Sequence, residues 1–196
     1  SIVDVNDSNI LYGTIYNGNM YKSTDQGTTA TSIPRPEETG WVTPLEQDKD
    51  GDLYFGGSSI YKSTDGGASW TAISQLFGWQ NFANQLKIAS SDKNIIFAST
   101  GNQLFKATNG GVDSGGGVGT GVENWSQING FSGSINSLSI HPTDPNKVAI
   151  AVTGTSEKVY VTTDGGANWT AKSTGLPDFT AYAIVWDNNG KDGLYL

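Results

Sequence analysis

Cysteine is absent from this chain of 196 residues, and histidine occurs once, at His141. Without thiols the protein can form neither a disulfide framework nor a thiolate metal site. A single imidazole cannot supply the histidine cluster that many zinc sites need. The sequence therefore predicts no cofactor and no metal centre built on cysteine or histidine.

Basic residues and long apolar runs are also scarce. Lysine and arginine total 11 against 19 for aspartate and glutamate, and the resulting net charge of -8 repels a phosphate backbone. No stretch approaches the roughly 18 apolar residues that a membrane-spanning helix needs. We therefore expect no nucleic-acid partner and no membrane span. Residues 1–4 lack the basic and apolar regions of a secretion signal, so a signal that directed export would have been removed.

Glycine and aromatic residues are abundant instead. There are 26 glycines, 6 tryptophans, 8 tyrosines and 7 phenylalanines, whereas charged residues make up only 15% of the chain. This composition is typical of aromatic-rich strands joined by tight turns. The length fits one all-β domain better than two separate domains.

A short motif recurs four times with a period near forty residues. Its copies begin at Tyr21, Tyr61, Phe105 and Tyr160, so the offsets are 40, 44 and 55 residues. The longest offset contains a glycine-rich insertion, residues 112–124. The insertion fits a hairpin tip better than a phosphate-binding loop, because it has no Lys-Ser or Lys-Thr pair. Self-similarity at this period is the signature of a repeat fold.

Each repeat contains four short runs of β-branched and aromatic residues bounded by glycine, asparagine and aspartate, which is the pattern of strands joined by turns. We name these strands A to D. One such sheet cannot bury both of its faces and must stack against its neighbours, as the blades of a β-propeller do. The sequence therefore predicts an all-β fold, a β-propeller with four blades of antiparallel strands and the A–B hairpin of a fifth. The expected blades are residues 1–37, 38–78, 79–130, 131–178 and, for the partial blade, 179–196.

The A strands lie between the motif copies of successive repeats. We expect them at residues 2–5, 41–45, 85–88, 135–140 and 181–186. The last hairpin would leave a sheet edge uncovered, which natural propellers avoid by closing the ring. We therefore expect the remaining blades of a longer chain, or another copy of this chain, to complete the ring. A closed ring of four blades with a spare hairpin is the remaining option.

The turn between strands C and D has the pattern Ser/Thr-x-Asp-x-Gly-x-x-Trp. Its aspartate can accept hydrogen bonds from N–H groups of the same turn, its glycine can adopt a positive φ, and its tryptophan can cover the base of the hairpin. We expect these residues to be structural. The first copy has Ala30 in place of tryptophan, and the third has Ala107 and the insertion, so we expect those two turns to be less well pinned. The motif residues are Ser23, Asp25, Gly27, Ser63, Asp65, Gly67, Trp70, Asn109, Gly111, Trp125, Thr162, Asp164, Gly166 and Trp169.

These turns resemble the Asp-box, or bacterial neuraminidase repeat, of sialidases, sortilin-type receptors, xyloglucan-degrading family 74 glycosidases and many secreted bacterial propellers. The stretch from His141 to Tyr195 is similar to surface proteins that Bacteroidetes export by the type IX secretion system. The resemblance implies a β-propeller fold and an extracellular or cell-surface location in bacteria. It implies no particular ligand.

Two enzyme activities of Asp-box proteins can be tested on the residues. A sialidase binds the substrate carboxylate with three arginines, and this chain has only Arg35, so sialidase activity is excluded unless further blades supply the others. A xyloglucanase-like glycoside hydrolase needs two carboxylates flanking a cleft. Glu37, Glu38 and Asp178 lie in expected loops, where we interpret them as solvated acids. We therefore predict no catalytic residue and keep the hydrolase fragment as the alternative.

The acidic segment Asp48-Lys-Asp50-Gly-Asp52 resembles half of a calcium loop, since alternating carboxylates can present oxygens to one ion. It lacks the distal glutamate of such loops. The same A–B position in the other repeats has ordinary turn sequences. We therefore interpret the segment as a turn, with calcium binding as the alternative.

Propeller geometry places the A–B and C–D turns at one face and the B–C and D–A connections at the other, where propellers usually bind ligands. Flat aromatic rings suit the C–H faces of sugars, and amides suit their hydroxyls. The same aromatic residues can instead simply fill the space between blades. Tyr16, Phe179 and Tyr182 lie in these connections, and the candidate binding residues are Trp79, Phe77, Phe82, Gln80, Asn81, Trp41, Arg35, Glu37 and Glu38.

The sequence and the resemblance together predict a non-enzymatic extracellular propeller segment. We expect it to act as a scaffold or as a recognition module for a polysaccharide or a cell-surface protein. A purely structural spacer within a long adhesin is a further alternative.

Overall fold

A computed structural model of the chain describes residues 1–37, 39–75, 82–111, 125–189 and 191–196, which form short strands and one 3-10 turn, η1 (Tyr16–Gly18). The first sheet contains β1 (Ile2–Val3), β2 (Leu11–Thr14), β3 (Met20–Ser23) and β4 (Thr31–Ile33). The second contains β5 (Leu45–Gln47), β6 (Leu53–Gly56), β7 (Ile60–Ser63) and β8 (Thr71–Ala72). The third contains β9 (Gln85–Ile88), β10 (Ile96–Thr100), β11 (Gln103–Ala107) and β12 (Trp125–Ile128). The fourth contains β13 (Ser134–Ile140), β14 (Val148–Thr153), β15 (Val159–Thr162) and β16 (Thr170–Ala171), and a hairpin of β17 (Val185–Trp186) and β18 (Leu194–Tyr195) follows.

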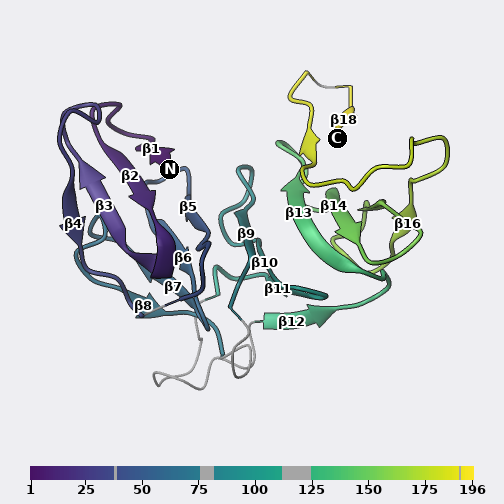
Figure 1. Ribbon diagram of the computed structural model, residues 1–196, viewed down its shortest axis with the longest axis horizontal. Coiled ribbons are helices and arrows are strands. Elements are labelled where there is room, and N and C mark those ends of the chain that lie inside the picture. Colours follow the sequence, from purple (N-terminus) through teal and green to yellow (C-terminus); the bar gives the residue numbers. More distant parts are fainter. Residues whose placement is uncertain (38, 76–81, 112–124, 190) are drawn as a thin grey trace.

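Consecutive strands pair antiparallel in every sheet, so each sheet is a meander. The first strands of neighbouring sheets contact one another in the order β1, β5, β9, β13 and β17. Figure 1 shows the sheets side by side along an arc, with these strands on its inner side and β4, β8, β12 and β16 on its outer side. The prediction of an all-β fold built from stacked four-stranded antiparallel blades is confirmed.

The hydrophobic core lies between the sheets. The middle strands β6, β10 and β14 are buried along almost their whole length, because a sheet covers each of their faces. Tyr54 of the second sheet and Leu86 of the third belong to one apolar cluster, and Phe97 and Ile150 belong to the next. A third cluster joins Ala151 of the fourth sheet to the β17–β18 hairpin. Stacking thus gives each blade the burial that it lacks alone.

Side chains of one blade also reach the backbone of its neighbour. The Trp125 indole of the third blade donates a buried hydrogen bond of 2.7 Å to the carbonyl of Ile73 in the second. The Lys106 ammonium of the third blade donates a hydrogen bond of 2.9 Å to the carbonyl of Gly165 in the fourth. The same ammonium lies 5.5 Å from the ring centroid of Phe97, its cross-strand partner within the third blade. Polar as well as apolar contacts therefore fix the blades against one another.

The innermost strands are connected by polar side chains. Gln85 of the third blade donates to the Asn136 carbonyl of the fourth at 3.0 Å, and Asn136 donates in turn to the Ala181 carbonyl at 3.0 Å. Lys87 forms an ion pair with Glu46 of the second blade. The inner edge of the arc is thus polar, in contrast to the apolar space between the sheets.

Two of the predicted A strands begin later than expected. In the second blade β5 starts at Leu45 and not at Trp41, because Pro44 has no N–H for the ladder and Thr43 and Thr39 are joined by their hydroxyls instead. In the fifth, residues 181–184 precede the two-residue strand β17. The residues before these strands therefore belong to the D–A connections.

Candidate ligand-binding face

Backbone hydrogen bonds define the two ends of the blades. In the first blade, the Gln26 N–H in the C–D turn donates to the Asn9 carbonyl in the A–B turn at 3.0 Å. At the other end, the Asn17 N–H in the B–C turn donates to the Gly40 carbonyl in the D–A connection at 3.2 Å. The B–C turns and D–A connections therefore lie together, as expected from propeller geometry, and we call their side of the molecule the ligand face.

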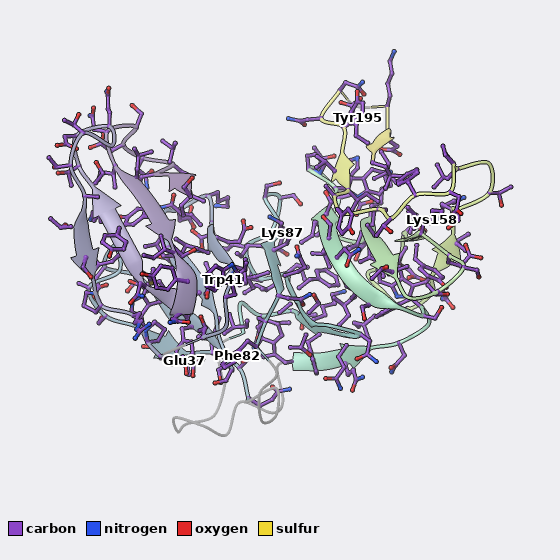
Figure 2. The ribbon with its side chains drawn as sticks, in the orientation of Figure 1. Glu37, Trp41, Phe82, Lys87, Lys158 and Tyr195 are labelled. Atoms are coloured by element: carbon purple, nitrogen blue, oxygen red, sulfur yellow. The ribbon has the colours of Figure 1, made fainter. Side chains whose placement is uncertain are left out.

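Two exposed aromatic residues on the ligand face form a stacked pair. Tyr16 of η1 and Trp41 of the D–A connection have ring centroids 5.8 Å apart and planes inclined by 20°. Trp41 is 78% exposed and Tyr16 is 52% exposed. Figure 2 shows Trp41 between the first two sheets and the third. We call this pair the aromatic platform.

The backbone under the platform is held in place. Asn17 adopts a positive φ of 60°, which few residues other than asparagine and glycine tolerate, and Asn19 donates its side-chain amide to the Tyr16 carbonyl at 3.0 Å. Arg35 donates to the Asn17 carbonyl. The arginine singled out in the sequence therefore supports the turn that carries Tyr16.

Glu37 also has a structural partner. Its carboxylate accepts hydrogen bonds from the Ser58 N–H and, at 2.7 Å, from the Ser58 hydroxyl in the B–C turn of the second blade. A Cβ at Gly57 would collide with this carboxylate, so a larger residue there would have to displace the Glu37 side chain. Burial, with the negative charge of Glu37, raises the pKa of the Tyr61 phenol above its ordinary value. Glu37 thus binds the second blade to the preceding connection.

The remaining candidate residues divide into two groups. Phe82 is half-buried and would meet a Cβ at Gly40 at 3.6 Å, so it packs between the D–A connections that flank the second blade. Figure 2 shows Phe82 and Glu37 near each other at the outer part of the arc. Five further candidates, Glu38, Phe77, Trp79, Gln80 and Asn81, lie outside the described residues.

On the opposite face, the C–D turns share one hydrogen-bond pattern. In the second blade the Ser63 hydroxyl donates to Asp65 at 2.8 Å and accepts from the Gly67 N–H at 2.9 Å. Asp65 also accepts from the N–H and the hydroxyl of Ser69, at 2.9 and 2.5 Å. Thr162 and Asp164 repeat the pattern in the fourth blade. These carboxylates are occupied by their own turns.

Protein groups also occupy the acidic A–B turn of the second blade. Asp48 is buried and accepts hydrogen bonds from the Asp50 and Asp52 N–H groups and from the Tyr54 hydroxyl, each at 3.0 Å. Asp50 forms ion pairs with Lys93 and with the adjacent Lys49, and Asp52 forms an ion pair with Lys62. Within the described part of the chain, no group of three or more histidine and acidic residues is placed to hold a metal ion. The geometry is that of a turn.

The sequence indicated that the B–C and D–A connections could bind a ligand, but it did not predict that Tyr16 and Trp41 stack on each other. Tyr16 and Trp41 lie in two separate loops, and no period or motif relates loop residues of different elements. The only sequence signal was the presence of aromatic residues at both positions.

Among the residues that the structure describes, no helix is long and apolar enough to span a bilayer.

Stacked antiparallel meanders with their first strands innermost define this chain as β-propeller blades. No protein-family model matches the chain, and no curated protein matches it. Among solved structures it is similar to a GH74 enzyme from Niastella koreensis, with 22% identity over 94% of this chain and 33% of that one and a TM-score of 0.72. It is also similar to the extracellular domain of the one-component system BT4673 from B. thetaiotaomicron, with 17% identity over 96% of this chain and 25% of that one and a TM-score of 0.67. A third similar structure is the Cps50 (Swd1) β-propeller domain of Myceliophteria thermophila, with 11% identity, coverage of 92% and 61%, and a TM-score of 0.64.

These likenesses establish the β-propeller fold. The chain spans about a third of the length of the first structure and a quarter of that of the second.

Proposed function

We propose that this chain is a non-enzymatic carbohydrate-recognition segment of an extracellular bacterial protein. The observation that carries the proposal is the stacked, exposed aromatic platform of Tyr16 and Trp41. Aromatic side chains of this size are normally buried, and an exposed pair on a supported backbone offers a flat apolar surface. The C–H face of a pyranose ring is complementary to such a surface, and Asn17 and Asn19 belong to the same turn as Tyr16.

Charge restricts the class of sugar. The net charge of -8 disfavours an anionic polysaccharide. Arg35, the single arginine, donates to the Asn17 carbonyl and supports the platform from the protein side. We therefore propose a neutral glycan as the ligand.

The extracellular assignment rests on similarity in sequence and structure. The C–D turns have the Asp-box pattern, and the C-terminal repeats resemble surface proteins exported by the type IX system. One similar structure is itself an extracellular domain. We propose that the parent protein is secreted or displayed at the cell surface.

A glycoside hydrolase fragment is the second candidate, and similarity to GH74 enzymes supports it. Hydrolysis needs two carboxylates on either side of the scissile bond. On the described ligand face, however, Glu37 is bound by Ser58 and Asp178 is paired with Lys158. We therefore place recognition first and hydrolysis second.

A glycan array followed by titration calorimetry tests the proposal. We expect binding to at least one neutral glycan, and a loss of about fivefold or more in affinity for Trp41→Ala, since stacking of this kind contributes about 1 kcal/mol or more. Val42→Ala is the matched control, because Val42 is the adjacent residue and is 73% exposed but has no ring. Trp79→Ala tests the other predicted aromatic anchor.

Two results would overturn the proposal. Absence of glycan binding by the unmodified chain would remove recognition. Release of reducing sugar from a bound glycan, abolished by Glu37→Gln or Asp178→Asn, would replace recognition with hydrolysis.

A further inference from the structure

A concavity lies at the place in the fourth and fifth blades that corresponds to the aromatic platform in the first and second. It has a volume of about 380 Å³ and is formed by the B–C turn of the fourth blade and the D–A connection that follows. The residues that matter for its chemistry are Thr153, Thr155, Glu157, Lys158, Asp178 and Phe179. The fourth and fifth blades thus have a hollow at the position where the first and second blades have the two exposed rings of the aromatic platform.

The backbone of this hollow is fixed by hydrogen bonds. The Lys158 N–H donates to the Ser173 hydroxyl at 2.7 Å, and the Val152 N–H donates to the Lys158 carbonyl at 2.9 Å. The Lys158 ammonium lies 3.1 Å from a carboxylate oxygen of Asp178 and 6.0 Å from the ring centroid of Phe179. A cation, a carboxylate and an aromatic ring therefore meet at one point.

This combination of groups suits a sugar. Each sugar hydroxyl both donates and accepts, so a sugar site needs donors and acceptors side by side. Lys158 supplies a donor, Asp178 an acceptor, and the threonine hydroxyls supply both. Phe179 is partly exposed and offers a ring for the C–H face of a pyranose. Ligand sites are typically concave, with a few polar groups that converge in this way.

We infer that the hollow at Lys158, Asp178 and Phe179 is a second binding site, which takes one neutral pyranose unit. The class of ligand in this inference rests on the proposed function, whereas the location of the site is argued from the hollow itself. Both sites belong to the ligand face, and Figure 2 shows Trp41 and Lys158 on either side of the third blade. A long polysaccharide that reaches both sites is bound with avidity, whereas a short oligosaccharide occupies one site at a time.

The test uses neutral oligosaccharides and polymers of glucose, mannose and galactose with the full chain. Amide chemical shifts are recorded during titration with each oligosaccharide, for the unmodified protein, for Trp41→Ala and for the double variant Asp178→Asn/Phe179→Ala. Tyr195→Ala is the control, because it removes an exposed aromatic ring outside both sites. Thermal unfolding of each variant checks that it is folded.

We expect two separate groups of shifts, one at residues 15–19 and 34–44 and one at residues 153–158 and 178–180. The double variant should abolish the second group, leave the first, and lower the affinity for a polymer by about 100-fold. Shifts in the first region alone would overturn the second site and leave the proposed function intact. Shifts in the second region alone would support this site and overturn the platform, and no shift with any sugar would overturn both.

Discussion

Each described aspartate of the C–D turns accepts hydrogen bonds from the residue four positions later. Asp25 accepts from both the N–H and the hydroxyl of Thr29, at 2.8 and 2.6 Å. This is the same set that Asp65 forms, although the first turn has Ala30 where the second has Trp70. The expectation that the first turn is less well pinned is therefore wrong for its hydrogen bonds. The aspartate and its partners hold the turn without the tryptophan.

These bonds make the stability of the protein depend on pH in the acid range. Hydrogen bonds from the Ser69 side chain and N–H, and from Ser63, lower the pKa of Asp65 to about 2, and equivalent bonds from Asn168 and Thr162 lower the pKa of Asp164 to about 2. A carboxylate whose pKa is lower in the folded state stabilises that state above its unfolded pKa. The contribution is lost as the pH falls through the folded pKa.

We therefore expect the free energy of unfolding to fall between about pH 4 and pH 2. The variant Asp65→Asn/Asp164→Asn should be less stable than the unmodified chain at pH 7 and should show a smaller fall on acidification. Urea unfolding at both ends of this range measures the difference. Glu157→Gln removes a carboxylate outside the C–D turns and is the control. An equal fall in all three proteins would contradict the assignment.

At the scale of the element, the sequence predicted the strands of the repeat because their residue types and spacing recur. It predicted the ends of the strands less well. Pro44 delays the start of β5 to Leu45, four residues after Trp41. Near β17, the hydroxyls of Ser137 and Ser139 accept hydrogen bonds from the Ile184 and Trp186 N–H groups. Such contacts join residues far apart in the sequence, so periodicity carries no record of them.

The tryptophans of the C–D turns show the same limit. The motif predicted that they cover the hairpin base, but not that they reach the preceding blade. Trp125 donates its indole N–H to the Ile73 carbonyl, whereas the buried Trp169 indole nitrogen has no hydrogen-bond partner among the described residues. Trp169 instead packs edge to face on Phe131, with centroids 5.7 Å apart.

This difference predicts unequal effects of one substitution. Trp125→Phe leaves the buried Ile73 carbonyl unsatisfied, so we expect it to cost about 1–3 kcal/mol more than Trp169→Phe, which removes ring area without breaking a hydrogen bond. Denaturant unfolding of the two variants provides the comparison, and the equilibrium m value checks that both unfold from the same kind of native state. Equal losses would show that the indole hydrogen bond does not contribute to holding the second and third blades together.

At the scale of the whole molecule, the sheets at the two ends of the arc each lack a neighbour on one face in this structure. Strand register places Val3 opposite Leu11, on the face of the first sheet that points away from the second. It likewise pairs Val185 with Tyr195, on the face of the last hairpin that points away from the fourth sheet. Val3 is 54% exposed and Val185 is 57% exposed. Figure 1 shows these two elements at opposite ends of the arc.

Exposed apolar strands of this kind favour association, because stacking a further sheet removes their side chains from water. We therefore expect this chain to self-associate, with a mass in sedimentation that rises above that of one chain as the concentration increases. Val3→Lys/Val185→Lys should restore the mass of a single chain, since each lysine would have to be buried in the contact. Val42→Lys, at an even more exposed apolar residue of the ligand face, should leave association unchanged. A monomer at every concentration would show that the end faces do not recruit a second copy.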